Sequence, residues 1–241
     1  MSELIINDGR EYIFPLFLVE TNNNEIYLES RQFLGTAFFV SKQGDAITAN
    51  HVMPQPADLP ENKRVVAIVQ HGAEQKACWI THFATFAGYD FALIHVNIDN
   101  TKYLTLSDCE VPAGSDIQIV GIPKHEVYSA GKEMRLLKGY VTLAFKQLEL
   151  NIAIPLGMSG SPVFMGSNVV AFATGTINSE EIDDYSEEVE KITDRKEQIT
   201  ITKVSRFTHY GLALPFYKLK NQSSPIFDNK TLKQFIDERN T

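Results

Sequence analysis

The sequence predicts an all-β protein whose strands fall into two halves of similar strand number. Most of the chain consists of short runs of β-branched and aromatic residues separated by Gly, Asn, Asp and Pro, which is typical of strands and turns. A polar stretch at 97–112 divides these runs into two groups, so we place the domains at residues 1–108 and 109–241. A chain of 241 residues buries roughly 70% of its extended surface on folding, so it needs no disulfide or metal for stability.

The first half is expected to open with a hairpin. Its arms would be residues 12–20 and 25–28, joined by Asn residues that tolerate the left-handed backbone of a tight turn. The other apolar or alternating runs of this half predict strands at 35–40, 46–48, 64–69, 76–85 and 91–96. In the second half, the same criteria predict strands at 116–122, 133–145, 148–154, 162–165, 169–176, 198–204 and 210–215.

Two segments predict helices instead of strands. Segment 178–197 is acidic and has apolar residues at helical spacing, so we expect an amphipathic helix inserted in the second half. These apolar residues are Ile182, Tyr185, Val189 and Ile192. At the C-terminus, Leu232, Phe235 and Ile236 would share one face of a helix at 228–240, after an Asp or Asn cap.

Composition and charge argue against several classes of protein. The chain has 22 Lys and Arg against 30 Asp and Glu, a formal net charge of −8, so we expect no binding to nucleic acid or to a membrane. It has neither the segments of a signal peptide nor an apolar run approaching about 18 residues. Cys78 and Cys109 occur in no metal-binding or paired pattern, so we expect reduced thiols, no metal and a cytoplasmic location. No motif predicts a cofactor.

Three short segments carry residues capable of catalysis. Ser159 lies between glycines, where a sharp turn would expose its hydroxyl and aim nearby backbone N–H groups at one point. His51 follows an apolar strand and is suited to act as a general base near neutral pH. Asp90 directly precedes an apolar strand, where its carboxylate would orient a histidine. Taken singly, each also fits a structural role as a turn residue or a core histidine.

In the order His51, Asp90, Ser159, with Gly157 two residues before the serine, the chain resembles the trypsin-like serine proteases of chymotrypsin fold. It is similar in particular to their Deg/HtrA-like branch. The segments that carry this resemblance are LGTAFFV (34–40), GDAITANHV (44–52), DFALI (90–94) and YGLALP (210–215). The resemblance implies two packed antiparallel six-stranded β-barrels, with the catalytic residues in the cleft between them.

The resemblance also implies a role for each site residue. Ser159 would be the nucleophile, His51 the general acid and base, and Asp90 the carboxylate that orients His51. The backbone N–H groups of Gly157 and Ser159 would bind the oxyanion. The residues that would line the specificity pocket are Ala153, Ile154, Thr174, Gly175, Thr176 and Gly211. Because none of these is acidic, we expect a small or medium apolar residue at P1.

The predicted function is therefore an intracellular serine endopeptidase that hydrolyses protein or peptide substrates through an acyl-enzyme. Met158 replaces the Asp with which zymogen-type relatives bind a new N-terminus, so no activating cleavage is expected. Only 26 residues follow the last predicted strand, so no PDZ domain is expected. The alternatives are a catalytically silent peptide-binding module and an esterase with the same triad. The acidic insertion 178–197 is predicted to gate the cleft or to bind an activator or partner protein.

Overall fold

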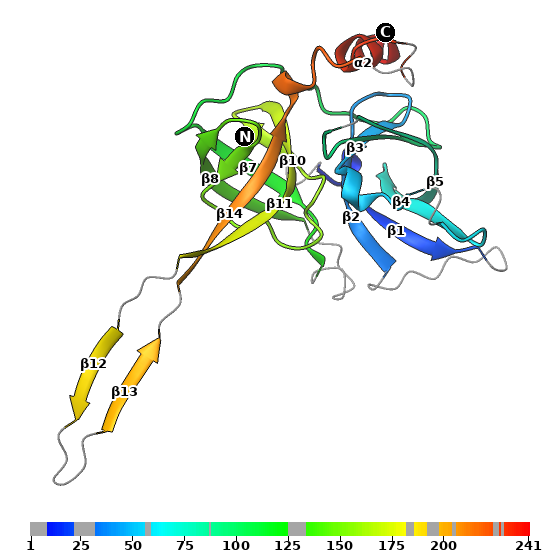
Figure 1. Cartoon of the computed structure of the whole chain (residues 1–241). Helices are drawn as coiled ribbons and strands as arrows, with labels where there is room; N and C mark the ends of the chain where they lie inside the picture. The colour runs from blue at the N-terminus through cyan, green and yellow to red at the C-terminus, as the bar shows by residue number, and fades with distance from the viewer. Residues whose placement is uncertain are drawn as a thin grey trace.

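The computed structural model describes residues 9–21, 32–55, 59–86, 88–124, 134–181, 186–191, 198–203, 206–223, 227 and 229–241, without the side chains of 82, 83 and 178–208. Strands dominate these residues, and most of them form two closed barrels that stand side by side (Figure 1). Among the described helices, none has the length and apolar character needed to cross a membrane.

The first barrel has the strand order β1-β2-β3-β6-β5-β4, and all its pairings are antiparallel. Its strands are β1 (Ile13–Glu20), β2 (Phe33–Phe39), β3 (Asp45–Thr48), β4 (Lys63–His71), β5 (Glu74–Thr85) and β6 (Ala92–Val96). β1 pairs with β2 on one side and with β4 on the other. The predicted second arm of the hairpin, at 25–28, lies outside the described residues.

The second barrel has the strand order β10-β11-β14-β9-β8-β7, again with antiparallel pairing throughout. Its strands are β7 (Asp116–Gly121), β8 (Arg135–Ala144), β9 (Leu148–Leu150), β10 (Pro162–Met165), β11 (Asn168–Glu181) and β14 (Arg206–Pro215). The predicted strand at 198–204 does not belong to this barrel. The domain boundary between residues 108 and 109 stays a prediction.

One hydrophobic cluster joins the two barrels. It contains buried residues of the first barrel, such as Phe38 and Phe91, together with Phe172 and Leu214 of the second. The rings of Phe91 and Phe172 meet edge-on, with centroids 5.9 Å apart and planes at 65°. Aromatic contacts of this kind contribute about 0.5–1.5 kcal/mol beyond the area that they bury, so they help to fix one barrel against the other.

The predicted helix in the acidic insertion 178–197 is wrong, because the described parts of this segment are strands. β11 continues to Glu181, which pairs with Arg206 of β14. Beyond it, β12 (Ser186–Lys191) and β13 (Gln198–Lys203) form a two-stranded sheet that lies away from both barrels (Figure 1). In a helix, acidic residues three and four positions apart would repel one another. In the observed register, the glutamates of β12 instead lie opposite Thr and Ile of β13.

The predicted C-terminal helix is present but shorter than 228–240. It is α2 (Leu232–Asn240), and it begins after Thr231 instead of an Asp or Asn. The Thr231 side chain accepts a hydrogen bond from the backbone N–H of Gln234, whose side chain in turn accepts one from the backbone N–H of Thr231. This capping box satisfies two N–H groups at the start of the helix.

Candidate active site

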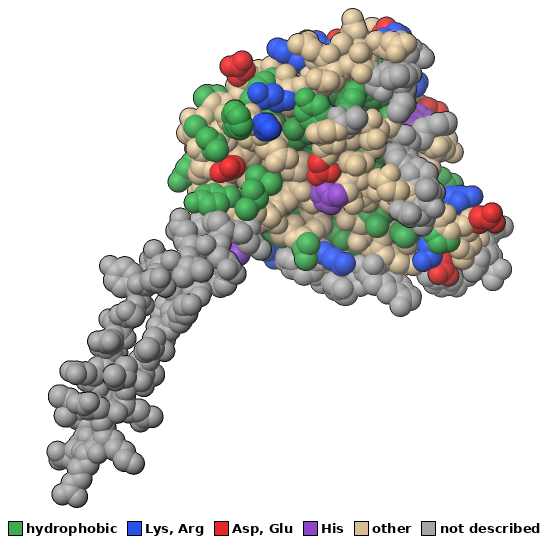
Figure 2. Space-filling view, viewed as in Figure 1, with side chains coloured by type: hydrophobic (Ala, Val, Ile, Leu, Met, Phe, Trp, Pro, Cys, Tyr) green, Lys and Arg blue, Asp and Glu red, His purple; other side chains and the backbone are tan. Residues whose placement is uncertain are grey.

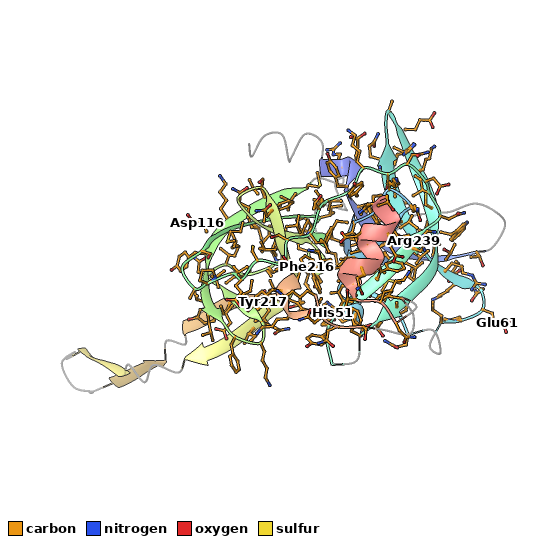
Figure 3. All side chains as sticks on the ribbon, turned by 90° about the horizontal axis from the view of Figure 1, so that it is seen from above. His51, Glu61, Asp116, Phe216, Tyr217 and Arg239 are labelled. Carbon is orange, nitrogen blue, oxygen red and sulfur yellow. The ribbon has the colours of Figure 1, made fainter. Side chains whose placement is uncertain are left out.

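A single pair of strands positions His51 and Asp90. β3 and β6 are paired so that Thr48 lies opposite Ala92. His51 follows Thr48 by three residues, in the short 3₁₀ helix η4 (Asn50–Val52), and Asp90 precedes Ala92 by two residues. The chain therefore brings the two side chains together at the same end of this strand pair. Figure 3 shows His51 where the two barrels meet.

Asp90 accepts two hydrogen bonds from His51, one on each carboxylate oxygen. Oδ2 of Asp90 lies 2.7 Å from Nδ1 of His51, and Oδ1 accepts the backbone N–H of His51 at 2.9 Å. Burial disfavours the charged form of Asp90, but the hydrogen bonds from His51, the charge of His51 and the backbone N–H of Asn50 outweigh burial and lower the pKa of Asp90. Asp90 is therefore ionised at neutral pH.

This pairing fixes how the ring of His51 is used. An ionised carboxylate only accepts hydrogen bonds, so Nδ1 of His51 must be the donor, and in the neutral ring the free lone pair lies on Nε2. The side chain of His51 is 50% exposed, whereas that of Asp90 is 28% exposed. The geometry thus presents a basic nitrogen to solvent or substrate while its partner carboxylate lies behind it.

The turn that carries Ser159 comes from the second barrel and is bound to the first. The backbone N–H of Thr36, on β2, donates to the carbonyl of Ser159 at 3.0 Å. Gly160 has a positive φ of 87°, and a Cβ at this position would lie 2.0 Å from the carbonyl oxygen of Thr36. That carbonyl also accepts the hydroxyl of Thr48 at 2.7 Å, three residues before His51. The structure therefore brings the Ser159 turn to the edge of the His51 site, and only glycine fits at residue 160.

The turn leaves two backbone donors unused. The N–H groups of Met158, Gly160 and Ser161 donate to the carbonyls of Pro155, Ala173 and Met158, respectively. Those of Gly157 and Ser159 donate to no residue that the structure describes. Gly157 has a φ of 93°, and a Cβ there would come within 2.4 Å of the Phe33 ring. A turn with alternate free N–H groups suits the binding of an oxyanion.

The residues predicted to line the specificity pocket come from two neighbouring regions. Thr176 on β11 pairs with Gly211 on β14. The hydroxyl of Thr176 accepts the backbone N–H of Ile154 at 2.8 Å and donates to the carbonyl of Ile154 at 3.1 Å. A Cβ at Gly211 would lie 2.9 Å from Cγ1 of Ile154. Thr176, Gly211 and Ile154 are thus adjacent in the structure.

The other predicted pocket residues differ in exposure. Ala153 is exposed, whereas Thr174 is buried and its hydroxyl has no partner among the described residues. Between Ala173 and Gly175 the register of β11 against β14 shifts, so Thr174 lies in a bulge. β10 pairs with β11 only as far as Phe172, so the edge that follows has no strand partner on that side among the described residues. Such an edge can pair with an extended peptide.

Sequence reasoning missed two kinds of residue at this site. The buried hydroxyl of Thr36 donates to the carbonyl of Gly157 at 2.8 Å and accepts the N–H of Ile122 at 3.2 Å. A threonine inside an apolar strand was the available signal, since a buried hydroxyl requires partners. Leu156 and Ile177 lie beside the turn and the pocket, with 82% and 44% of their surface exposed. Nothing in the sequence distinguishes them from core residues.

The charged side chains on the face that Figure 2 shows are mixed in sign among the residues that the structure describes. Figure 2 shows Lys and Arg scattered among acidic and apolar side chains over the coloured surface of this face. Across the part of the chain that the structure describes, no group of three or more His, Cys, Asp or Glu could hold a metal ion.

Two comparisons with known proteins bear on this site. The family description that matches the chain is a trypsin-like peptidase domain, over residues 35–171, a range that includes His51, Asp90 and Ser159. No curated protein sequence matches the chain. Among solved structures, the HtrA-type protease AlgW with a decapeptide matches with a TM-score of 0.54 and 14% identity. The match covers 87% of this chain and 63% of that chain, and it confirms the predicted fold of two chymotrypsin-like barrels.

Proposed function

Because the chain belongs to the trypsin-like peptidase family, we propose that it is an intracellular serine endopeptidase with Ser159, His51 and Asp90 as its catalytic triad. The observation that carries the proposal is the pairing of His51 with Asp90 through both carboxylate oxygens. A histidine held in this way can act as the base that activates a serine hydroxyl, and we assign that hydroxyl to Ser159 in its glycine turn.

In the proposed reaction, Oγ of Ser159 attacks the carbonyl carbon of the peptide bond while Nε2 of His51 takes the hydroxyl proton. The imidazolium then gives this proton to the leaving amine as the C–N bond breaks, which leaves an ester on Ser159. Water attacks the ester, its proton passes to Nε2 and from there to Ser159, and the acid product leaves. Asp90 stays ionised and stabilises the imidazolium, a role that its lowered pKa supports.

The proposed oxyanion site consists of the backbone N–H groups of Gly157 and Ser159. Their lack of described partners supports this assignment, because both are free to donate to a charged oxygen. Each such donor is worth about 3–4 kcal/mol in comparable sites. The carbonyl between them, that of Gly157, is held by Thr36, which keeps both donors in place before substrate binds.

The proposed substrate is a peptide in extended conformation with a small or medium apolar P1 residue. Thr174, Gly175 and Thr176 would pair with the substrate backbone along the open edge of β11. Ala153, Ile154 and Gly211 would contact the P1 side chain, and the two hydrogen bonds between Thr176 and Ile154 would hold this part of the pocket in place. The exposed Leu156 and Ile177 would contact apolar substrate residues on either side.

The cellular setting and partner are also proposals. Cys78 and Cys109 are both free thiols, which is consistent with a reducing compartment such as the cytoplasm. Segment 178–197 has nine acidic and three basic residues. Its strand β12 forms a hairpin with β13, and this hairpin lies away from both barrels (Figure 1). We propose that this hairpin binds a basic segment of an activator or partner, through an attraction that salt would weaken.

Labelling with a fluorophosphonate probe tests the proposed function. Ser159→Ala should abolish labelling and lower peptide turnover by roughly 10⁴–10⁶-fold without unfolding the protein. His51→Ala should lose a similar amount, because nucleophile and base act as a unit. Ser161→Ala is a matched control, since its hydroxyl is buried and has no partner among the described residues.

Each alternative gives a different result. A silent binding module would not be labelled in the wild type, and an esterase would be labelled but would turn over esters and not peptides. Labelling that persists in Ser159→Ala, or that is lost in Ser161→Ala alone, would contradict the assignment of Ser159 as nucleophile.

A further inference from the structure

The last segment of the chain returns from the second barrel to the first. After β14 ends at Pro215, the 3₁₀ helix η7 (Phe216–Lys218) and α2 follow, and their buried side chains join the cluster that contains the first barrel's core. These buried side chains, with those of the connecting residues, are Phe216, Leu219, Phe227, Leu232 and Ile236. Figures 1 and 3 both show α2 over the first barrel.

The end of α2 is bound to the turn between β2 and β3. Arg239 donates from Nη1 to Oε1 of Gln43 at 2.6 Å, and Asn240 donates from Nδ2 to the carbonyl of Val40 at 3.1 Å. The guanidinium of Arg239 also lies over the ring of Phe235, 5.1 Å from its centroid. The helix is therefore a fixed support on the first barrel.

Two phenylalanines enclose the turn that carries Asp90. Phe86 and Phe91 are both buried, and their ring centroids lie 5.0 Å apart. Between them, the backbone N–H of Tyr89 donates to the carbonyl of Phe86 at 3.2 Å. Asp90 lies inside this turn, so a shift of the Phe86 ring would move the backbone from which its carboxylate projects.

Phe227 packs against this turn from the C-terminal segment. Its ring meets that of Phe86 edge-on, with centroids 5.3 Å apart and planes at 69°, and it also contacts Phe235 of α2 at 5.0 Å. Only 2% of Phe227 is exposed. Gln222, from the same segment, reaches the hydroxyl of Tyr89 at 3.5 Å. The segment thus supports the turn at two neighbouring residues, Phe86 and Tyr89.

We propose that Phe227 is a positioning residue for Asp90. Phe227 packs between Phe235 of α2 and Phe86, and so holds the turn that carries Asp90 in place. This keeps each Asp90 carboxylate oxygen within hydrogen-bond distance of its donor on His51. Each carboxylate oxygen has its own donor, so a small rotation of the turn weakens both hydrogen bonds together. The effect of Phe227 on the His51–Asp90 hydrogen bonds follows from these contacts alone. The effect of Phe227 on catalysis rests also on the proposed function.

The experiment compares Phe227→Leu and Phe227→Ala with the wild type, using two independent readouts. The first is the low-field proton resonance of Nδ1 of His51, assigned by its loss in Asp90→Asn, since a proton shared with a carboxylate is strongly deshielded. The second is peptide hydrolysis. We expect Phe227→Ala to weaken or shift the resonance. It should also lower kcat by about 10–100-fold and leave KM within about twofold of the wild type, because misplacing a catalytic group by about 1 Å has effects of this size. Phe227→Leu, which keeps an apolar side chain but loses the ring contacts with Phe86 and Phe235, should shift the resonance in the same direction and lower kcat by at least about threefold.

Phe14→Leu is the matched control, because Phe14 is buried in the same cluster and its described ring partner is Phe39. Even where Phe14→Leu lowers the free energy of unfolding in urea as much as a Phe227 variant does, it should leave the resonance and kcat unchanged. An equal change in Phe14→Leu, or an unaltered resonance in Phe227→Ala, would overturn the proposal. If Phe227→Ala does not fold, Phe227→Leu decides, and wild-type resonance and kcat in that variant would reject the role. The Phe227 variants could change the resonance although the fluorophosphonate probe labels neither them nor the wild type. That result would reject the proposed function but support the positioning role of Phe227.

Discussion

Replacing Thr36 by valine tests how the turn with Ser159 is held to the first barrel. Valine keeps the shape of threonine but removes the hydroxyl that donates to the carbonyl of Gly157 and accepts the N–H of Ile122. Thr36 is inaccessible to solvent and Ile122 nearly so, so water cannot replace the lost partner of the Ile122 N–H. The substitution therefore leaves one donor and one acceptor of the backbone unsatisfied.

The expected loss of stability follows from these two groups. The buried N–H of Ile122 without a partner costs about 1–3 kcal/mol, whereas the half-buried carbonyl of Gly157 costs less because water can reach it. The added methyl group returns about 0.8 kcal/mol, so the net loss in free energy of unfolding should be about 2 kcal/mol. The carbonyl of Gly157 lies between the two proposed oxyanion donors, so its release should also lower kcat by about 10–100-fold, up to the loss of one donor.

Urea unfolding and peptide hydrolysis measure the two effects, with Thr36→Ser as the control. Serine keeps the hydroxyl and loses one methyl group, so it should lower the free energy of unfolding by only about 1 kcal/mol and leave kcat nearly unchanged. Equal losses in the valine and serine variants would show that packing, and not the hydroxyl, matters at this residue. A valine variant within about 0.5 kcal/mol of the wild type would refute the reasoning.

Three further predictions concern Asp90, the pocket and the insertion. The pKa of Asp90 is lowered in the folded protein, so its hydrogen bonds stabilise the fold above the unfolded-state pKa of about 3.9 and this stabilisation is lost as the pH falls through the lower folded-state value. Asp90→Asn should therefore flatten the decline of the urea midpoint below about pH 4, and an unchanged decline would contradict this. In a library of peptides that differ at P1, substrates with Ala, Val or Leu should exceed those with Arg or Lys by at least about 10-fold in kcat/KM. Thr176→Gly should shift this preference to larger P1 residues. A wild-type protein that prefers Arg at P1 would refute the pocket assignment. Replacing residues 182–205 by a two-residue turn should abolish the salt-sensitive binding of an oligolysine probe. The same change should alter kcat/KM on small neutral peptides by less than about twofold. Unchanged oligolysine binding would reject the insertion as a docking site.

The pairing of His51 with Asp90 could be predicted from the sequence because both residues are tied to regular strands. His51 and Asp90 each lie within three residues of a strand end, and β3 and β6 are paired in antiparallel register. Strands of this kind are readable from short apolar runs, so the motif residues at their ends are found with them. The structure then brings the side chains of His51 and Asp90 into hydrogen-bond contact, as the proposed triad requires.

The contacts of Thr36 could not be predicted in the same way. Its hydroxyl bonds to Gly157, 121 residues further along the chain, and that contact exists only because the two barrels pack against each other. A local pattern specifies which face of a strand is buried, but it does not specify the partner of a buried hydroxyl. The same limit applies to Thr176, whose partner Ile154 comes from a loop and not from a neighbouring strand.

The insertion shows where local periodicity misleads. Four apolar residues at helical spacing favour a helix in isolation, but segment 178–197 is followed by β13, whose Thr and Ile alternate. Pairing with that strand satisfies the backbone of both strands, and this effect outweighs a weak helical preference. A sequence with competing patterns needs its partner strand to be identified before its own conformation is assigned.

The residues of the proposed site come from both barrels, and this predicts how the proposed activity would be lost. His51 and Asp90 belong to the first barrel and Ser159 to the second, and the contacts between Thr36, Thr48 and Gly160 lie at the boundary. Each barrel closes its own strands, so loosening this boundary need not unfold either one. We therefore expect the proposed nucleophile, Ser159, and the proposed base, His51, to lose their alignment before either barrel loses its strands. Activity, and not circular dichroism, is therefore the sensitive measure of damage at the boundary.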